Sequence, residues 1–305
     1  MWQPEAHWER LPTGMSPTTV GVWRVRDHEA GTVEIVKRLA APMPGDPGEY
    51  SVPDHVGYWR RAAEVADSHL VEATSGLRGP VLTRLEEDAE GITFGYRNVE
   101  HADLADTFVA RALGRFAASG LGDRAWLARH QFTDRMQRVE HRGGWTTLSR
   151  TTVADLADRL WTRRSHFIDA LGELPVVPQH GDAVPTNLLG RDQEDVLAID
   201  WSTLGVGPVG SDLGYWSLSS SEDFDTLLDA YVDGLPPGIA TRDQACLGAQ
   251  ITAVYTALSC ADWALAQAAI GTGALAAKYS HPSVAPYLRA LQRHFPQLQG
   301  LLFDG

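Results

Sequence analysis

Cysteine is scarce in this sequence: Cys246 and Cys260 are the only two among its 305 residues. Their surroundings favour a single helix, in which fourteen residues at about 1.5 Å each hold the two thiols roughly 21 Å apart. A disulfide cannot span that distance, because its two Cα atoms lie within about 7 Å of each other. The sequence therefore excludes a small secreted domain held together by disulfides.

Basic residues are also in short supply. Lys and Arg number 26 against 39 Asp and Glu, which gives a formal net charge of −13 and an isoelectric point near 5.2. Nucleic acids and anionic membranes attract basic surfaces, so we expect neither as a partner. The charge permits a cationic ligand without requiring one, since many proteins are acidic simply to stay soluble.

Long apolar runs are missing too. Residues 1–10 contain charges and a proline but not the apolar stretch of a signal peptide. The longest charge-free run, 244–261, carries Gln, Thr and Ser, which indicates a buried Ala-rich helix and not a membrane span. We therefore expect a cytoplasmic protein, and no sequence pattern chooses between a monomer and a homodimer.

What is present suffices for a proper core, because 44% of the residues are hydrophobic and 21% are charged. The first hundred residues alternate apolar and polar positions, which is typical of strands, and the rest has helical periodicity. The predicted strands are 20–26, 32–39, 79–85 and 91–99, with one helix at 54–68. The later predicted helices are 102–119, 126–139, 152–171, 224–232, 242–267 and 284–295.

This order predicts an α+β protein with two lobes. A small β-rich N-terminal lobe covers 1–98, and a larger, mostly helical C-terminal lobe covers 99–305. Between the helices lies a short strand-rich island from Val176 to about Asp200, which carries the most informative residues.

Within the island, two short apolar runs flank a polar turn and predict an antiparallel hairpin. The register that places Leu188 opposite Ile199 also places Asn187 opposite Asp200, with Cα atoms about 4.5–5.5 Å apart. An amide oxygen and a carboxylate at that separation can hold one Mg²⁺, which favours few protein oxygens together with phosphate oxygens. The sequence therefore predicts a site for metal-bound phosphate groups.

Asp182 lies five residues before Asn187, on a loop broken by Pro185. That spacing can place a second carboxylate beside the metal pair yet aimed elsewhere, as a base that activates a hydroxyl needs. These parts are the ones that phosphoryl transfer uses. Each residue also has a structural alternative: Asp182 as a turn residue, Asn187 as a β-bulge residue and Asp212 as a helix N-cap.

The same residues resemble those of a known family. His180-Gly-Asp-x-x-x-x-Asn187, then Asp200 thirteen residues later and then Asp212, is similar to the aminoglycoside phosphotransferase/choline kinase-like family of small-molecule kinases. The resemblance implies a bilobal protein-kinase-like fold, with Asp182 as catalytic base and Asn187 and Asp200 as Mg²⁺ ligands. It also implies that His180 and Asp212 brace the catalytic loop without touching the substrate.

The N-terminal half should then supply the binding site for ATP or GTP. Lys37 shares a strand face with Val33 and Ile35, which points it to the covered side of the sheet, whereas Arg38 should face solvent. A lysine there needs anions, and phosphate oxygens are such anions. The alternative is a surface lysine on an edge strand.

Two further segments resemble nucleotide-binding parts of these kinases. Gly14 and Ser16, just before the first predicted strand, match their short phosphate-binding loop. Asn98 and Val99, at the end of the last predicted strand, match the hinge whose backbone groups meet the purine ring.

One position departs from the family. Relatives read Tyr-Trp-Arg-Arg-Glu where this chain reads Tyr58-Trp-Arg-Arg-Ala62, and that Glu pairs with the strand lysine. Either Glu64, two residues later, reaches Lys37 through a shifted helix, or the pair is missing. We favour Glu64.

The sequence predicts the acceptor less directly than it predicts the nucleotide site. Asp262 interrupts an apolar helix where relatives build the acceptor pocket, so it either binds a cationic amine or occupies an exposed helix position. The hypothesis is an ATP- or GTP-dependent O-phosphotransferase that acts on an antibiotic hydroxyl, aminoglycoside-like or other, as a resistance enzyme. A kinase of sugars, amino alcohols or nucleosides is the alternative, and an inactive nucleotide-binding pseudokinase is the alternative of another class.

A protein kinase is disfavoured. Gly181 stands where those enzymes usually carry an Arg that senses phosphorylation, and only eleven residues separate Asp200 from Asp212. That spacing is too short for a peptide-docking activation segment, and the Gly-rich stretch 205–210 indicates a compact turn.

Overall fold

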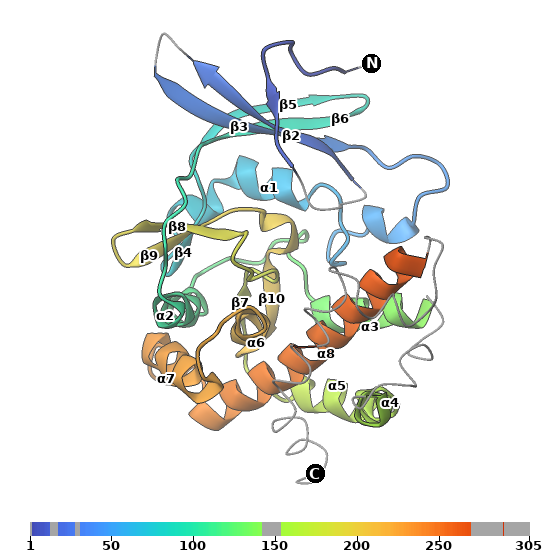
Figure 1. Ribbon diagram of the computed structural model, residues 1–305, viewed down its shortest axis with the longest axis vertical. Helices are drawn as coiled ribbons and strands as arrows, with labels where there is room; N and C mark the ends of the chain where they lie inside the picture. Colours follow the sequence, from blue (N-terminus) through green and yellow to red (C-terminus); the bar gives the residue numbers. More distant parts are fainter. Residues whose placement is uncertain (1, 13–17, 28–30, 142–153, 270–288, 290–305) are drawn as a thin grey trace.

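The computed structural model describes every residue except 1, 13–17, 28–30, 142–153, 270–288 and 290–305. A twisted β-sheet forms one end of the molecule and helices form the other (Figure 1). The described strands are β1 (Glu9–Arg10), β2 (Thr19–Asp27), β3 (Thr32–Ala40), β4 (Leu77–Arg78), β5 (Leu82–Asp88), β6 (Gly91–Arg97), β7 (Val176–Gln179), β8 (Leu188–Asp192), β9 (Asp195–Ala198) and β10 (Gly205–Pro208). The described helices of regular α form are α1 (Arg61–Ser68), α2 (Asp106–Phe116), α3 (Gln131–His141), α4 (Ala154–Thr162), α5 (Arg164–Gly172), α6 (Ser211–Ser217), α7 (Phe224–Gly234) and α8 (Arg242–Ala269).

The N-terminal sheet has five strands in the order β1-β2-β3-β6-β5, all paired antiparallel. Its inner face carries Leu39, Ile92 and Phe94, which pack on Ala62 and Ala63 of α1. Each large side chain buried in this way contributes about 1.5–3 kcal/mol. Small alanines on α1 let the helix lie close beneath the sheet (Figure 1).

The outer face of the sheet is covered as well, which corrects the expectation that Arg38 faces solvent. Arg38 is 2% exposed, and its guanidinium donates to Asp88 at 2.6 Å and lies 5.1 Å from the ring of Trp2. Trp2, Trp8 and Trp23 form a cluster with ring centroids 5.2–6.2 Å apart. The N-terminal segment thus folds back over strand positions that would otherwise meet water.

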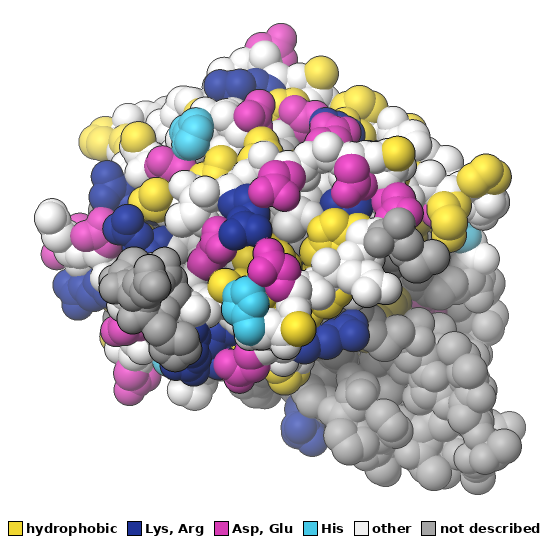
Figure 2. All heavy atoms as spheres, turned by 90° about the horizontal axis from the view of Figure 1, so that it is seen from above, with side chains coloured by type: hydrophobic (Ala, Val, Ile, Leu, Met, Phe, Trp, Pro, Cys, Tyr) yellow, Lys and Arg dark blue, Asp and Glu magenta, His cyan; other side chains and the backbone are white. Residues whose placement is uncertain are grey.

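Figure 2 shows this end of the molecule from above, with acidic and basic side chains interspersed over the face. No continuous area of one charge covers the described part of that face.

The helical part packs around α8, which runs diagonally across it in Figure 1. Gly214 brings α6 against α8, because a Cβ at this position would collide with the Ala249 carbonyl oxygen. Cys246 and Cys260 both lie on α8 as free thiols, as the sequence predicted. Among the helices of the described residues, none combines the length and apolarity that crossing a bilayer requires.

The two parts of the chain are joined by more than the connection after β6. Leu77 and Arg78 of β4 pair in parallel with Val196 and Leu197 of β9, so a segment from the N-terminal part completes a sheet of the C-terminal part. The division into lobes at residue 98 stays a prediction, and this pairing crosses it.

The order of strands and helices follows the sequence-based prediction, with differences at particular segments. The helix predicted at 54–68 begins only at Arg61, because residues 52–60 form a series of turns. The helix predicted at 152–171 is divided at Arg163 into α4 and α5. The stretch expected as a turn at 205–210 contains β10, which pairs with β7. The helix predicted at 284–295 lies outside the described residues except for Arg289, which is helical.

Candidate active site

The loop that follows β7 carries Asp182. Its backbone turns at Gly181, whose φ of +81° lies in the left-handed region that favours glycine. A Cβ here would also collide with the side chain of Gln131. Gly181 is therefore needed for the shape of the loop.

Asp212 fixes this loop from the first turn of α6. Its carboxylate accepts the backbone N–H of His180 at 2.7 Å and that of Gly181 at 2.9 Å. Burial raises the pKa of Asp212, although the two N–H groups and His180 oppose that effect. The Asp212 carboxylate therefore holds the loop and does not cap α6, whose N-cap residue is Gly210.

His180 joins the loop to the end of the hairpin. Its Nε2 lies 2.9 Å from the Ile199 carbonyl oxygen, and its Nδ1 accepts the backbone N–H of Asp182 at 3.3 Å. These contacts together fit the tautomer with its proton on Nε2. The imidazole also packs on Trp201, with centroids 4.7 Å apart.

Asn187 holds Asp182 directly. The Asn187 Nδ2 donates to the Asp182 Oδ2 at 2.8 Å and to its backbone oxygen at 3.0 Å. Both N–H groups of the amide are thereby used, which leaves the amide oxygen of Asn187 for another partner. The loop sets Asp182 and Asn187 side by side, as their spacing predicted.

Tyr215 is a second partner of Asp182, and the sequence analysis missed it. Its phenol hydrogen-bonds to the Asp182 carboxylate, and the pKa of Tyr215 is raised well above its ordinary value by burial and by the charge of Asp182. Arg135 lies 5.0 Å from the Tyr215 ring centroid and donates to the Gly181 carbonyl oxygen at 2.5 Å. The spacing of Asp212 and Tyr215, three residues apart on α6, was the available signal, because such residues share a helix face.

Asp200 follows the hairpin of β8 and β9, and the register differs by one residue from the expected one. Leu188 pairs with Ala198 and not with Ile199, because a bulge interrupts the pairing between Leu188 and Gly190. Asn187 is consequently opposite Ile199, whose N–H donates to the Asn187 carbonyl oxygen at 2.8 Å. Asp200 comes next, with a left-handed φ of +57°. Such a backbone is strained for a non-glycine residue and is found preferentially at functional sites.

Lys37 reaches Asp200 across the space between the sheet and the hairpin. The Lys37 Nζ lies 2.8 Å from the Asp200 Oδ1, and the lysine side chain is 15% exposed. Burial raises the pKa of Asp200, but the charge and hydrogen bond of Lys37 outweigh this effect and hold it below the ordinary value. The lysine does lie on the covered side of the sheet, which excludes a surface position.

The residues fit a magnesium ion held jointly with phosphate groups. Asn187 offers an amide oxygen and Asp200 a carboxylate, the hard oxygen donors that Mg²⁺ takes in small number alongside phosphate oxygens. Within the described part of the chain, no three His, Cys, Asp or Glu side chains gather to hold a metal by themselves. The two oxygens therefore suit an ion that enters with a nucleotide.

Glu64 is not the partner of Lys37 in this structure, contrary to the interpretation favoured from sequence. Its Oε1 lies 3.4 Å from the Nε of Arg60, and Arg60 is itself held by Glu87. Ala62 lines the same cavity as Lys37, so the position that relatives fill with Glu does approach the lysine. The helix has not turned to bring Glu64 there.

Arg61 explains why α1 is fixed. It is fully buried, and each of its five N–H groups donates to a backbone carbonyl oxygen at 2.6–3.2 Å. The acceptors are Pro53, His55, Val56, Trp126 and Ser202. Burial lowers the pKa of Arg61 to about 10. Because Ser202 is two residues beyond Asp200, one side chain ties α1 to the candidate metal ligand.

The remaining predicted residues are placed as follows. Asn98 donates its N–H to the Val33 carbonyl oxygen at 3.0 Å, and Val99 lies so close to Gly190 that a Cβ there would be 2.9 Å from its side chain. Gly14 and Ser16 lie outside the described residues. Asp262 is 7% exposed on α8, so the exposed alternative is wrong, and its role in acceptor binding stays a prediction.

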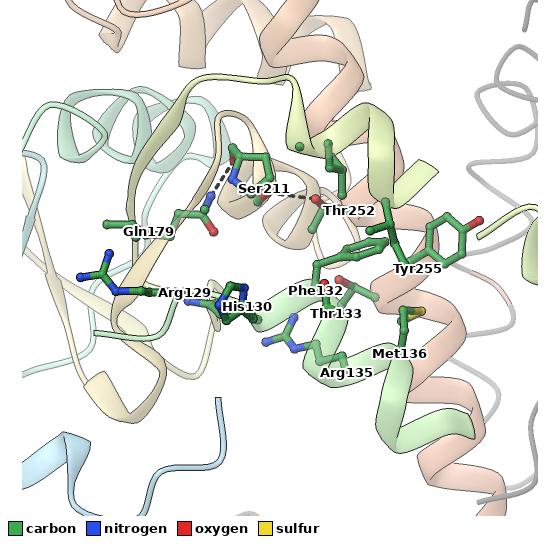
Figure 3. A pocket seen from close by; sticks show the side chains of 18 residues that line it. Arg129, His130, Phe132, Thr133, Arg135, Met136, Gln179, Ser211, Thr252 and Tyr255 are labelled. Carbon is green, nitrogen blue, oxygen red and sulfur yellow. Dashed lines mark hydrogen bonds between the residues drawn. The ribbon is translucent and has the colours of Figure 1, made fainter. Parts of the chain in front are cut away.

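Two cavities lie near these residues. The larger, of about 580 Å³, is bounded by β2, β3, the segment before α1, and the ends of α3 and α8. Lys37 and Ser202 line it, so it adjoins the candidate phosphate site. The smaller, of about 130 Å³, lies between α3, β7, β10 and α8, and Figure 3 shows its lining. The two share no lining residue.

Comparison with known proteins agrees with this arrangement. The family model described as "Phosphotransferase enzyme family" matches residues 58–244, more than half of the chain. No curated protein matches. Among solved structures, a choline/ethanolamine kinase family protein from Mesorhizobium loti has a TM-score of 0.58 at 17% identity, covering 96% of this chain and 92% of its own.

Two further solved structures are similar. Amicoumacin kinase hAmiN, in complex with AMP-PNP, Ca²⁺ and amicoumacin, has a TM-score of 0.58 at 12% identity, covering 98% of this chain and 90% of its own. A thermostable mutant of aminoglycoside phosphotransferase APH(4)-Ia has a TM-score of 0.53 at 14% identity, covering 97% and 95%. With its β-rich and helical parts arranged as in these protein-kinase-like folds, the chain belongs to the phosphotransferase enzyme family and is a small-molecule kinase.

Proposed function

We propose that the protein transfers the γ-phosphoryl group of ATP or GTP to a hydroxyl group of a small molecule. The observation that carries this proposal is the constellation of Asp182, Asn187, Asp200 and Lys37. A hydrogen bond joins Asn187 to Asp182, an ion pair joins Lys37 to Asp200, and the Ile199 N–H links the backbone before Asp200 to Asn187. The solved neighbours that contain AMP-PNP or ADP support a nucleoside triphosphate as donor.

In this proposal Asp182 orients the acceptor hydroxyl and takes its proton while the oxygen forms a bond to the γ-phosphorus. The bond from that phosphorus to the β–γ bridging oxygen breaks, and the nucleoside diphosphate leaves. Asn187 and Tyr215 fix the carboxylate, and Lys37 is placed to meet phosphate oxygens. Mg²⁺, when held by Asn187 and Asp200, supplies positive charge against the phosphate groups.

The acceptor that we consider first is an antibiotic, as in a resistance enzyme, and the second is a metabolite. Neighbours of both kinds exist, since their names include amicoumacin kinase, macrolide 2'-phosphotransferase and choline kinase. An inactive pseudokinase has Ala62 as its only support, whereas Asp182, Asn187 and Asp200 are all present.

The test is a screen of hydroxyl compounds for a mass gain of one phosphoryl group with ATP or GTP and Mg²⁺. Asp182→Ala should abolish the transfer while leaving nucleotide affinity within about threefold, because general-base loss costs about 10²–10⁴ in rate. Asp192→Ala, which removes a surface ion pair with Arg78, is the matched control and should keep full activity. Normal transfer by the Asp182→Ala variant would show that the base is assigned wrongly, and absence of any Mg²⁺-dependent nucleotide turnover would favour the pseudokinase.

A further inference from the structure

The larger cavity is lined by residues one helical turn away from those that hold the loop of Asp182, although Asp182 is not itself part of the lining. On α3, Arg138 of the cavity lining lies one turn beyond Arg135, which binds the Gly181 carbonyl oxygen. On α8, Trp263 of the lining lies one turn beyond Cys260, whose thiol hydrogen-bonds with Tyr215. With Lys37 and Ser202 at its other wall, the cavity lies between the candidate phosphate site and the two helices that contact the loop of Asp182.

Aromatic rings make up much of this lining. Tyr50, Tyr58 and Trp59 come from the segment between β3 and α1, and Trp263 comes from α8. Trp263 is 38% exposed, which is unusual for an indole and leaves part of its ring uncovered. Such rings offer flat apolar surfaces on which a sugar or a heterocycle can lie.

The charged side chains of the lining do not favour a cation. Its only described carboxylate, Glu49, is held by Arg138 at 2.8–2.9 Å and faces His55 at 3.9 Å. The other charged lining residues are Lys37 and Arg138, with His141 beside them. Lys37 is itself paired with Asp200 at 2.8 Å and Arg138 with Glu49, so the described wall carries close to no net charge, although the chain as a whole carries −13.

The aromatic faces already hold cations. The Arg60 guanidinium lies 5.4 Å from the Trp59 ring centroid, and that of Arg61 lies 5.8 Å from Tyr58. These distances are those of cation–π contacts, so the two rings are less able to accept an ammonium group from a ligand.

The smaller cavity leads to the same conclusion. Its described lining contains Arg129, His130 and Arg135 and no acidic residue. Among the described lining residues, neither cavity therefore has an unpaired carboxylate that could neutralise an amine.

From these observations we infer that the acceptor is an uncharged, ring-bearing hydroxyl compound, such as a neutral glycoside or nucleoside, and not a polycationic aminoglycoside. This inference rests on the proposed function and specifies its substrate class. In this inference the acceptor stacks on Trp263 and Tyr50, two of the rings that line the cavity.

Binding of two probes to the intact protein with Mg²⁺ and AMP-PNP tests this inference. The uncharged probe is 4-nitrophenyl β-glucoside and the cationic probe is hygromycin B, each titrated by calorimetry. The glucoside should bind on the order of tenfold more tightly than hygromycin B. Trp263→Ala and Tyr50→Ala should each weaken glucoside binding about fivefold or more. Trp2→Ala, on the outer face of the sheet, is the matched control and should change nothing.

Three results would overturn the inference: tighter binding of hygromycin B, no detectable glucoside binding, or glucoside binding that neither cavity variant weakens. Each leaves the proposed kinase function standing, because Mg²⁺-dependent transfer and its loss in Asp182→Ala are measured separately. Phosphorylation of hygromycin B in preference to neutral acceptors would likewise reject the substrate class and uphold the kinase.

Discussion

The phosphate side and the acceptor side of the cleft are built in different ways. On the phosphate side, Asp182, Asn187 and Asp200 lie within nineteen residues of sequence, and each is fixed by short hydrogen bonds or an ion pair. On the proposed acceptor side, the large cavity is lined by four Tyr and Trp rings together with smaller and paired charged residues, from segments as distant as Tyr50 and Trp263. The first is a charged site with a local origin, and the second is a less charged site assembled by the fold.

This difference separates what the enzyme shares with its family from what is its own. Chemistry that is common to many acceptors needs one set of charges at fixed distances, which a short loop and hairpin provide. The choice of acceptor depends on the residues that surround these charges, and those residues can differ between sequences without disturbing the charges. The global charge of −13 therefore says little about the acceptor, because the charged side chains of the described cavity wall are paired with one another or with Asp200.

The largest expected effect lies on the phosphate side. Asp200→Asn should lower kcat/KM for the nucleotide by about 10²–10³-fold, since it removes a metal-binding charge and the counter-ion of Lys37. A raised Mg²⁺ requirement in steady-state kinetics should accompany the loss. Asp195→Asn, at the far end of the hairpin, should leave both parameters unchanged.

The pH dependence of Asp200 has a definite sign. Its pKa is held below the ordinary 3.8, so the ion pair with Lys37 stabilises the fold above that pH and is lost as the pH falls through the lowered pKa. An Mg²⁺ affinity that already declined between pH 7 and pH 5 because of this group would contradict the assignment.

A smaller effect is expected where the two sides meet. Tyr215→Phe removes the phenol that holds Asp182 and should lower kcat about tenfold, with little change in either KM. Because burial and Asp182 keep the pKa of Tyr215 well above 10, the wild-type rate should show no decline from this group below pH 10. Tyr231→Phe is a suitable control, since its phenol accepts the Gly210 N–H away from Asp182. Equal effects of the two variants on kcat would mean that Tyr215 is only structural.

The smallest effect is expected at Glu64. Glu64→Gln should change kcat/KM by less than about twofold, because this carboxylate forms a partly exposed ion pair with Arg60. In an assay that measures ADP release, Lys37→Met should lower kcat/KM far more than Glu64→Gln does. Comparable losses in both variants would show that Glu64 and Lys37 do pair during turnover.

The sequence predicted the relative positions of Asp182 and Asn187 well for a physical reason. Asp182 and Asn187 are joined by a loop of fixed shape, and Asp200 follows a short hairpin, so spacing alone limits their positions. The error of one residue in the register came from the bulge after Leu188, which periodicity does not reveal.

The other residues depend on contacts between distant segments. Tyr215 and Arg135 reach the catalytic loop from α6 and α3, and no local pattern distinguishes them from other core residues. Arg38 was assigned to solvent because strand alternation cannot show that Trp2 covers that face. The same limit explains the wrong prediction that Glu64 pairs with Lys37. The rotation of α1 about its axis decides which residue faces the lysine, and that rotation depends on what the helix packs against.

The rotation of α1 about its axis is fixed by Arg61 in an unusual way. Its five bonds go to uncharged carbonyl oxygens, so none of these bonds is lost when an acidic side chain is titrated. An outward swing of α1 would separate a buried guanidinium from the carbonyl oxygens of Trp126 and Ser202, which lie far from it in sequence. The loss of those two acceptors makes such a displacement costly and argues against control of this enzyme through a movable α1.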